Sequence, residues 1–284
     1  MDFLWHIVAL LGTFIPSILG QNLIFGKGKI LHFGPVGASI ISAYSSVLVL
    51  MATQSFLLSF IAGLVAALLL SLLFAWLSLK LDSDAFGVMT IAVHLAMLSI
   101  VLNWSSLTRG ARGINDIPRL PFLDSVFDFA LLSLVISILY TLWIWHIDRS
   151  AFGRQLAALS EHEWHAQALG IDKGKIHIGA FLISGVGISI VNFLFPQYLM
   201  LLYPNDYQFP AFVFMIMIIV AGKPGSVLGV TLSTILLVVF KEALRFVPLA
   251  PSILGPVRLI LFGLILFASV WWRRDSLFPQ RRSV

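Results

Sequence analysis

The sequence contains no cysteine, which excludes disulfide bonds, a thiolate nucleophile and metal sites built from thiolates. Charge is also scarce, because Lys, Arg, Asp and Glu make up 11% of the residues, against about 25% in an average soluble domain. Hydrophobic residues make up 59%, and the mean hydropathy is +0.99. This composition predicts an all-α polytopic membrane protein and not a soluble domain.

The net charge is +5, but the basic residues are scattered at the ends of apolar runs and form no basic face interleaved with aromatic residues. No nucleic-acid partner is therefore predicted. The N-terminal stretch MDFLWHIVALLGTFIPSILG lacks both a basic beginning and a small-residue cleavage site. We expect it to be a retained span and not a signal peptide. We expect residues 1–284 to form a single transmembrane domain.

Long runs without charge mark the expected spans, since about 20 apolar residues cross a bilayer as a helix. Lys29 and Lys80 enclose fifty uncharged residues, enough for two helices with a hinge near Thr53 and Gln54. About nine transmembrane helices are expected, within a range of eight to ten, at 3–25, 30–51, 56–79, 85–103, 126–147, 176–196, 208–222, 226–246 and 255–272. The run 208–222 is barely long enough, so a half-span or a re-entrant hairpin fits it as well.

Lys and Arg are distributed unequally between the two ends of these spans. If the polar loop at 154–175 is cytoplasmic, the cytoplasmic side holds twelve of them and the outside holds six. The outer six are Arg109, Arg112, Arg119, Lys241, Arg245 and Arg258. Because cytoplasmic loops are enriched in Lys and Arg, this bias predicts an outside N-terminus and a cytoplasmic C-terminus. Trp271 and Trp272, beside Arg273 and Arg274, are expected to anchor the last span at the cytoplasmic interface.

The most polar stretch of the chain is RQLAALSEHEWHAQALGIDKGK. Its HEWH sequence is similar to the zinc-protease motif H-E-x-x-H, but His165 follows His162 by three positions where the motif needs four. The stretch GQNLIFGKGK is similar to the nucleotide-binding motif G-x-x-x-x-G-K-[ST] but also departs from it. Gly20 and Gly26 are six positions apart where the motif needs five, and Gly28 replaces Ser or Thr. We therefore expect no catalytic residue, no metal site and no cofactor on this chain.

The same polar stretch has the pattern of a short helix. It contains no Gly or Pro from Arg154 to Leu169, and Gly170 follows as a C-terminal stop. The residues that share one face of such a helix are Leu156, Leu159 and Ala166. An interfacial helix usually carries Lys and Arg on its polar face, whereas this one carries Glu161 and Glu163. It is either a connector at the headgroups or, as its acidity favours, a helix that docks into a groove of a partner protein.

The stretch FGRQLAALSEHEWHAQALGIDKGKIHIGAFLISG resembles the cytoplasmic loop and following span of ABC-transporter permeases for branched-chain amino acids, the LivM type. The residues that match the pattern of that family are Phe152, Gly153, Arg154, Leu156, Ala158, Leu159, Glu161, Glu163, Ala166, Leu169, Gly170, Ile171, Asp172, Ala180, Phe181, Ile183 and Ser184. LGQNLIFGKGKILHFGPVGASIISAYSS, LTRGARGINDIPR and AGKPGSVLGVTLSTILLVVFKEALR resemble further blocks of the family. Departures such as Arg109 and Lys223-Pro224 leave the substrate open.

The resemblance implies an ABC importer permease fold with a cytoplasmic coupling helix in the loop of about 148–175. It implies transport of branched-chain amino acids or a similar small polar solute across a bacterial inner membrane, with urea or short-chain amides as alternatives. The implied partners are two cytoplasmic ATPase subunits that hold ATP and Mg²⁺, a second permease subunit and an extracytoplasmic solute-binding protein. The residues expected to meet the ATPase are Arg154, Leu156, Leu159, Glu161, Glu163, Ala166, Leu169 and Gly170. In such a coupling helix the packing surface would consist of Leu156, Leu159 and Leu169. Arg154, Glu161 and Glu163 would set its register on the ATPase through ion pairs.

Polar groups inside the apolar spans are candidates for a transport pathway, because such groups are costly in a membrane and often functional. They are Asn22, His32, His94, Asn103 and Asn192, each of which is otherwise explained by a hydrogen bond to a neighbouring helix. The outward loop is expected to contact the binding protein through Thr108, Gly110 and Gly113. Glu242 and Arg245 are expected to pair near the outer rim.

Two further expectations concern packing and energy source. Six glycines are expected to allow close approach of helices, namely Gly34, Gly37, Gly63, Gly179, Gly185 and Gly187. A stand-alone secondary transporter or channel is the competing class of function, and a transporter of that kind would need an acidic residue deep in a span. The sequence places its acids in loops or at span ends, with Glu242 near an end.

Overall fold

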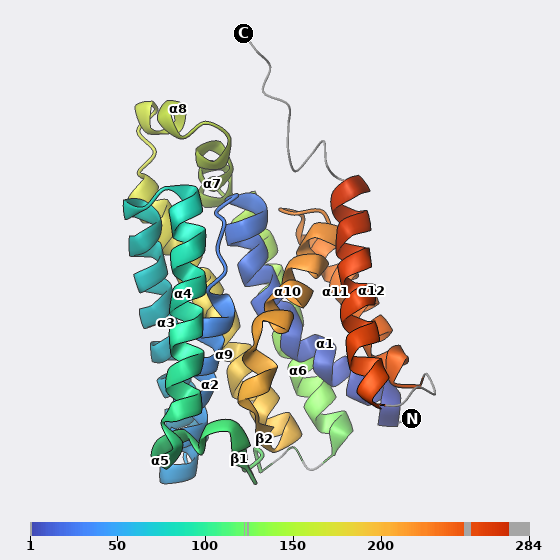
Figure 1. Ribbon diagram of the computed structural model, residues 1–284. Helices are drawn as coiled ribbons and strands as arrows, with labels where there is room; N and C mark the ends of the chain where they lie inside the picture. The colour runs from blue at the N-terminus through green and yellow to red at the C-terminus, as the bar shows by residue number, and fades with distance from the viewer. Residues whose placement is uncertain (1, 122, 124, 247–250, 273–284) are drawn as a thin grey trace.

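The computed structural model describes residues 2–121, 123, 125–246 and 251–272, which form a bundle of helices (Figure 1). Eight helices in these ranges are long and apolar enough to cross a membrane. They are α1 (Asp2–Gln21), which continues into the π-helix η1 (Asn22–Lys27), α2 (Pro35–Thr53), α3 (Phe56–Lys80), α4 (Ser83–Asn103), α6 (Val126–Arg149), α9 (Lys173–Leu199), α11 (Val227–Ala243), which continues into η4 (Leu244–Phe246), and α12 (Pro251–Trp272). The prediction of an all-α polytopic protein is confirmed.

Shorter elements connect these spans, most of them at the two ends of the bundle. They are α5 (Ser105–Thr108), η2 (Gly110–Arg112), β1 (Ile114–Asn115), α7 (Ala151–Glu161), α8 (Glu163–Ala168), β2 (Leu201–Leu202), η3 (Pro204–Tyr207) and α10 (Phe209–Ala221). The strands β1 and β2 pair in antiparallel fashion, with Ile114 opposite Leu202. Figure 1 shows α7 and α8 at one end of the bundle, and α5, β1 and β2 at the other. We call these the α7–α8 end and the β-ribbon end.

Two predicted spans differ from the structure. The run predicted at 208–222 forms α10, which has 13 residues and is about 20 Å long at ~1.5 Å per residue. That is short of the ~30 Å hydrocarbon thickness, so the half-span reading fits this helix. The run predicted as a helix at 30–51 is helical only from Pro35, and residues 28–34 form no regular helix or strand, with Lys29 at a φ of +50°. Proline favours the first position of a helix because it lacks the N–H that would be unpaired there.

Side-chain caps define the beginnings of several spans. Ser125 and Asp128 form a reciprocal capping box at α6, and Ser226 accepts the backbone N–H of Gly229 at 3.1 Å at α11. Asp172 accepts the backbone N–H of Lys175 at 3.1 Å at the start of α9, and this hydrogen bond lowers the pKa of the Asp172 carboxyl. Each cap satisfies a donor that has no partner within the helix. The helix ends thus follow short polar signals between the apolar runs.

Small residues allow the central helices to pack closely, as the glycine pattern predicts. A Cβ atom at Gly187 in α9 would lie 2.7 Å from the Tyr140 hydroxyl of α6, and closer still to the backbone carbonyl of Pro16 in α1. Gly63 of α3 faces α2, where the hydroxyl of Ser42 donates to the Gly63 carbonyl at 2.9 Å. In a bilayer, such close approach replaces the hydrophobic driving force that holds soluble helices together.

The glycine contacts make a prediction about stability. Gly187→Val inserts a branched side chain between α1, α6 and α9, so we expect a loss of roughly 1–3 kcal/mol and a lower melting temperature in detergent. Gly263→Val in α12 is the control, because a Cβ there meets no atom within 4 Å. Equal melting temperatures for the two variants would contradict the close packing of α9.

Candidate functional site

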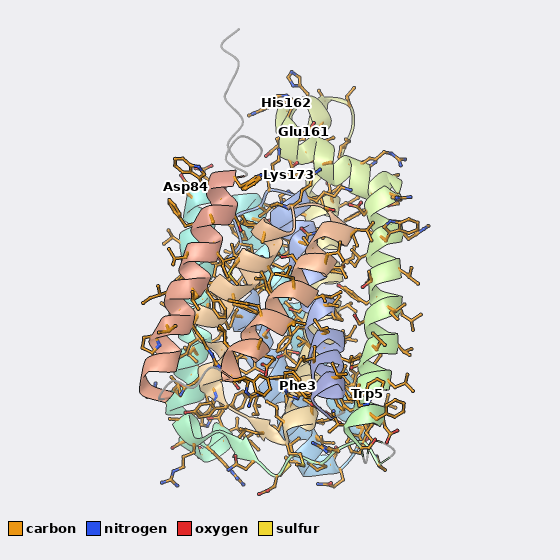
Figure 2. The ribbon with its side chains drawn as sticks, turned by 90° about the vertical axis from the view of Figure 1, so that its right-hand side faces the viewer. Phe3, Trp5, Asp84, Glu161, His162 and Lys173 are labelled. Atoms are coloured by element: carbon orange, nitrogen blue, oxygen red, sulfur yellow. The ribbon has the colours of Figure 1, made fainter. Side chains whose placement is uncertain are left out.

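The loop between α6 and α9 folds as two short helices, which corrects the prediction of one continuous helix. His162 has φ −146° and ψ 86°, and this extended residue separates α7 from α8. The bend turns the chain back, so that the Glu163 carboxylate meets the Lys173 ammonium at 2.7 Å. Gly170 has a φ of +85°, which confirms the predicted C-terminal stop. Figure 2 shows Glu161 and His162 projecting at this end, with Lys173 nearer the spans.

The inner face of α7 and α8 packs against the chain itself. Leu156, Leu159 and Ala166 are buried in one cluster with residues of η1, α3 and α9, including Ile24 and Ile176. Leu156 and Leu159 share the buried face of α7, as predicted, whereas Ala166 is buried on the separate helix α8. The expectation that Leu156 and Leu159 form a packing surface for another protein is corrected, because only 1% and 7% of these residues is exposed.

The outer face of α7 and α8 presents apolar and acidic groups to the surroundings. Trp164 is 87% exposed and Leu169 is 84% exposed, beside the exposed residues Glu161 and His162. Glu161 forms no ion pair with the described residues, whereas Glu163 also accepts from the Gln167 amide at 3.0 Å. Large exposed apolar groups beyond the spans are typical of interaction sites. We call Glu161, Trp164 and Leu169 the outer patch.

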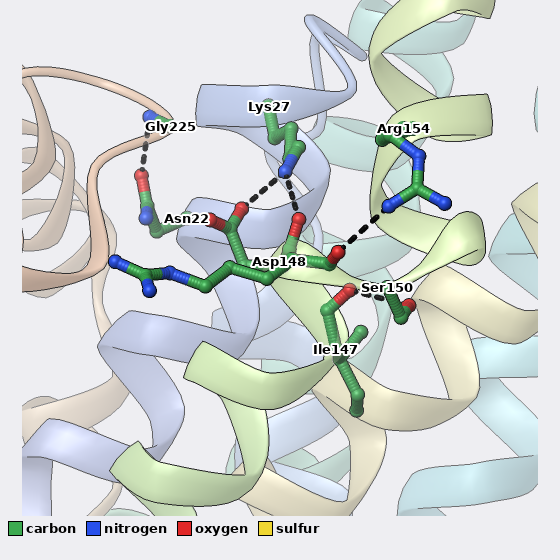
Figure 3. A network of polar contacts seen from close by, with 8 residues as sticks. Asn22, Lys27, Ile147, Asp148, Ser150, Arg154 and Gly225 are labelled. Carbon is green, nitrogen blue, oxygen red and sulfur yellow. Dashed lines mark hydrogen bonds and ion pairs between the residues drawn. The ribbon is translucent and has the colours of Figure 1, made fainter.

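A polar junction joins the base of α7 to the first span (Figure 3). The Lys27 ammonium at the end of η1 donates to the backbone carbonyl of Asp148 at 2.6 Å and forms an ion pair with the Asp148 carboxylate. Arg154 donates to the backbone carbonyl of Arg149 at 2.9 Å, so its guanidinium bonds an unpaired carbonyl near the end of α6. Sequence reasoning missed the junction because Lys27 and Asp148 are 121 positions apart.

The π-helix η1 connects this junction to the turn between α10 and α11. The Asn22 side-chain oxygen accepts the backbone N–H of Gly225 at 2.9 Å, as Figure 3 shows. Gly225 has a φ of +81° and Lys223 has a φ of +72°, so the turn is left-handed at both residues. Asn22 therefore has a structural partner, and it joins two segments that are 203 positions apart.

The other predicted pathway residues do not converge on one place. His32 is buried among the rings of Phe74, Phe86 and Phe181, with centroid distances of 4.7 to 5.7 Å. His94 is buried where α4 meets Gly37 of α2, and neither ring nitrogen has a hydrogen-bond partner among the described residues. The remaining two differ in exposure. Asn103 is exposed and donates to the Ser99 carbonyl, whereas Asn192 is buried and accepts from the Tyr207 hydroxyl at 3.0 Å.

Asn192 lines a cavity of about 340 Å³ that lies between α1, α2, α9, η3, α10, α11 and α12. Its polar and charged lining residues are Ser17, Ser39, Asn192, Asn205, Asp206, Tyr207, Lys241 and Glu242. Glu242 pairs with Arg245 at 2.8 Å, which confirms the predicted pair, and it lies 3.6 Å from His6. The sequence analysis did not select Asp206 or Lys241, since both lie at ends of apolar runs where charge is ordinary.

The β-ribbon end corrects the predicted binding-protein contacts. Thr108 is 4% exposed, and its hydroxyl donates to the backbone carbonyl of Val101 at 2.6 Å. Gly110 and Gly113 are buried and have φ angles of +57° and +70°, so both shape the turn. A partner at this end would instead meet exposed neighbours such as Arg112.

No cluster of three or more His, Asp or Glu side chains in the described ranges has the arrangement of a metal site.

Comparison with known proteins adds independent information. Residues 6–270 match the protein family described as branched-chain amino acid transport system / permease component. The chain is 27% identical to the high-affinity branched-chain amino acid transport system permease protein LivM of Escherichia coli strain K12, over 93% of this chain and 67% of the relative. The probable branched-chain amino acid transport permease protein LivM of Methanocaldococcus jannaschii is 25% identical over 79% of this chain and 68% of that protein. No solved structure matches significantly.

The two faces of α7–α8 make a prediction that the cysteine-free sequence makes simple to test. A single cysteine in Leu169→Cys is expected to react with a water-soluble maleimide at the rate of an unfolded control. Leu156→Cys is expected to react at least about tenfold more slowly until the protein is denatured, because opening of a packed site costs free energy. Equal rates for both variants in the folded protein would contradict the packing of α7.

Proposed function

The chain belongs to the permease-component family of branched-chain amino acid transport systems, and we propose that it is the membrane-spanning subunit of an ATP-driven importer. The proposed complex contains two cytoplasmic ATPase subunits, a second homologous permease subunit and an extracytoplasmic solute-binding protein. ATP and Mg²⁺ are held by the ATPase subunits, and this chain provides the path through a bacterial inner membrane. The proposed cargo is a branched-chain amino acid, in keeping with the names of the relatives.

The outer patch is the observation that carries this proposal. Trp164 and Leu169 are exposed at the α7–α8 end, and Glu161 adds a negative charge that forms no ion pair with the described residues. A few aromatic and charged residues dominate most protein interfaces, so this patch suits a groove in a partner with basic residues at its rim. The buried inner face holds the patch firmly against the spans.

Movement of the outer patch would reach the spans through the contacts already described. A pull on α7 acts on Asp148, which is bonded to Lys27 at the end of η1. The same π-helix is bonded to Gly225 through Asn22. A movement of η1 would therefore also move the turn between α10 and α11. These two helices line the 340 Å³ cavity. ATP-driven closure of the partner would therefore change the shape of a site inside the membrane.

A stand-alone secondary transporter is less well supported. It would need an acidic residue inside a span that can bind and release an ion. Glu242 is the acid of α11 that lines the cavity, and Arg245 already neutralises it at 2.8 Å.

The docking proposal is tested with Glu161→Lys and Trp164→Ala in the assembled complex. Each variant is expected to weaken co-purification of the ATPase on the order of tenfold or more, as loss of an interface hot spot does. ATP hydrolysis should also lose its dependence on the transported solute. Asp84→Lys is the control, because Asp84 is exposed at the same end but lies away from α7 and α8 (Figure 2). Normal assembly and transport in both variants would contradict the docking role.

The proposed orientation places the α7–α8 end in the cytoplasm. A membrane-impermeant thiol reagent is therefore expected to label Arg112→Cys in intact cells and Leu169→Cys only in inverted vesicles. The chain contains no other cysteine, so each signal comes from one site. The reverse labelling pattern would contradict an outside N-terminus.

A further inference from the structure

The cavity near the β-ribbon end has walls that are mostly apolar. Leu10 and Phe14 of α1, Phe195 of α9, Phe214 of α10 and Phe262 of α12 all line it. A volume of about 340 Å³ is within the roughly 300–1,000 Å³ range of small-molecule sites. Sites of that kind combine such walls with a few polar groups that orient the ligand.

Two charged side chains of opposite sign line this cavity without a partner. Lys241 of α11 and Asp206 of η3 form no ion pair or side-chain hydrogen bond with the described residues. The Lys241 ammonium lies 5.3 Å from the centre of the Phe214 ring, which supplies only a weak cation–π contact. Both charges therefore keep free capacity to bind a ligand.

Three other polar residues of the cavity, Glu242, Tyr207 and Asn192, already have partners. Glu242 is paired with Arg245, and the Tyr207 hydroxyl donates to the Asn192 side-chain oxygen at 3.0 Å. The Asn192 amide donates in turn to the backbone carbonyl of Ile188 at 2.7 Å. A ligand therefore meets one cation and one anion as its main polar contacts.

Lys241 and Asp206 are close enough to influence each other across the cavity. Partial burial raises the pKa of the Asp206 carboxyl, and the Lys241 charge lowers the same pKa in part. Both side chains line the same cavity, so one ligand inside it could contact both charges. Asn205 and Asp206 are exposed, so they mark the mouth of the cavity.

We propose that this cavity is a binding site within the permease for a zwitterionic α-amino acid with an apolar side chain. The ligand carboxylate would contact Lys241, its ammonium group would contact Asp206, and its side chain would lie among the phenylalanine rings. The site rests on the proposed function as a permease, and it adds recognition of the solute by this chain itself.

The charges select against the alternative solutes. Urea and short-chain amides carry no charge, so they would form no ion pair with Lys241 or Asp206 and would leave the part-buried Lys241 ammonium without a counter-charge. A fatty acid would satisfy Lys241 alone. A zwitterion with an apolar body satisfies both charges and fills the apolar walls.

The test is a binding titration with tritiated leucine. The full chain, assembled with its permease and ATPase partners, is placed in lipid nanodiscs without the binding protein. Saturable binding is expected, and 4-methylpentanoate and leucinamide, which each lack one charge of leucine, should compete at least about tenfold more weakly. Urea and acetamide should not compete. Absence of saturable binding, or equal competition by acetamide, would overturn the site.

Variants locate the binding within this chain. Lys241→Gln and Asp206→Asn are each expected to weaken leucine binding on the order of tenfold, because a charge-assisted contact is lost. Lys80→Gln and Asp84→Asn remove exposed charges at the opposite end and should bind leucine as the unaltered chain does. Unchanged affinity in both cavity variants would place any leucine site elsewhere and overturn this one.

Two readouts separate this site from the proposed function. Co-purification of the ATPase with the cavity variants checks their folding and tests the proposed function alone. If leucine is transported by the complex while Lys241→Gln has no effect on binding, the cavity proposal fails and the proposed function stands. If no complex assembles, the proposed function fails, and the same titration of the chain alone still decides the site.

Discussion

The structure depends on hydrogen bonding of backbone groups that lie inside the bundle but outside regular helix. A lipid-embedded chain has no water to satisfy such groups, so protein side chains must do so. The Gln21 amide donates to the His32 carbonyl at 3.1 Å, and Thr90 accepts the Phe33 N–H at 3.1 Å. Asn22 does the same for Gly225 at 2.9 Å. These bonds permit a non-helical segment at 28–34 and a left-handed turn between α10 and α11.

Interrupted helices also explain how a partner at one end could influence a cavity near the other. Straight helices have few places where they can change direction, whereas η1, residues 28–34 and the turn at 222–226 each end a regular ladder of hydrogen bonds. The α7–α8 loop is buried on its inner face against η1, and the turn at 222–226 is bonded to the same segment. A chain of contacts therefore runs from the α7–α8 loop, which carries Glu161, through η1 and the turn at 222–226 to α11, which carries Lys241 in the cavity wall.

The spans could be predicted from sequence because charges collect at their ends, and Gly170 and the Glu242–Arg245 pair were predicted from local rules. The non-helical segment at 28–34 was missed because residues 30–34 belong to the same uncharged run as the helix that follows. The break at His162 was missed because no Gly or Pro marks it, and the accompanying Glu163–Lys173 contact joins residues ten positions apart. Lys27 with Asp148 and Lys241 with Asp206 come together only in the fold, since no local pattern joins distant positions. Asn22 and Asn192 likewise have hydrogen-bond partners, Gly225 and Tyr207, that helical periodicity does not reveal.

The central claim is that this chain moves a solute only as part of an ATP-driven complex. The most direct measurement is leucine uptake into proteoliposomes that contain the chain, its permease and ATPase partners and the binding protein. The account predicts concentrative uptake that requires ATP on the side of the α7–α8 end and continues after all ion gradients are collapsed. Uptake by the chain without ATPase subunits, driven by a proton or sodium gradient, would contradict it.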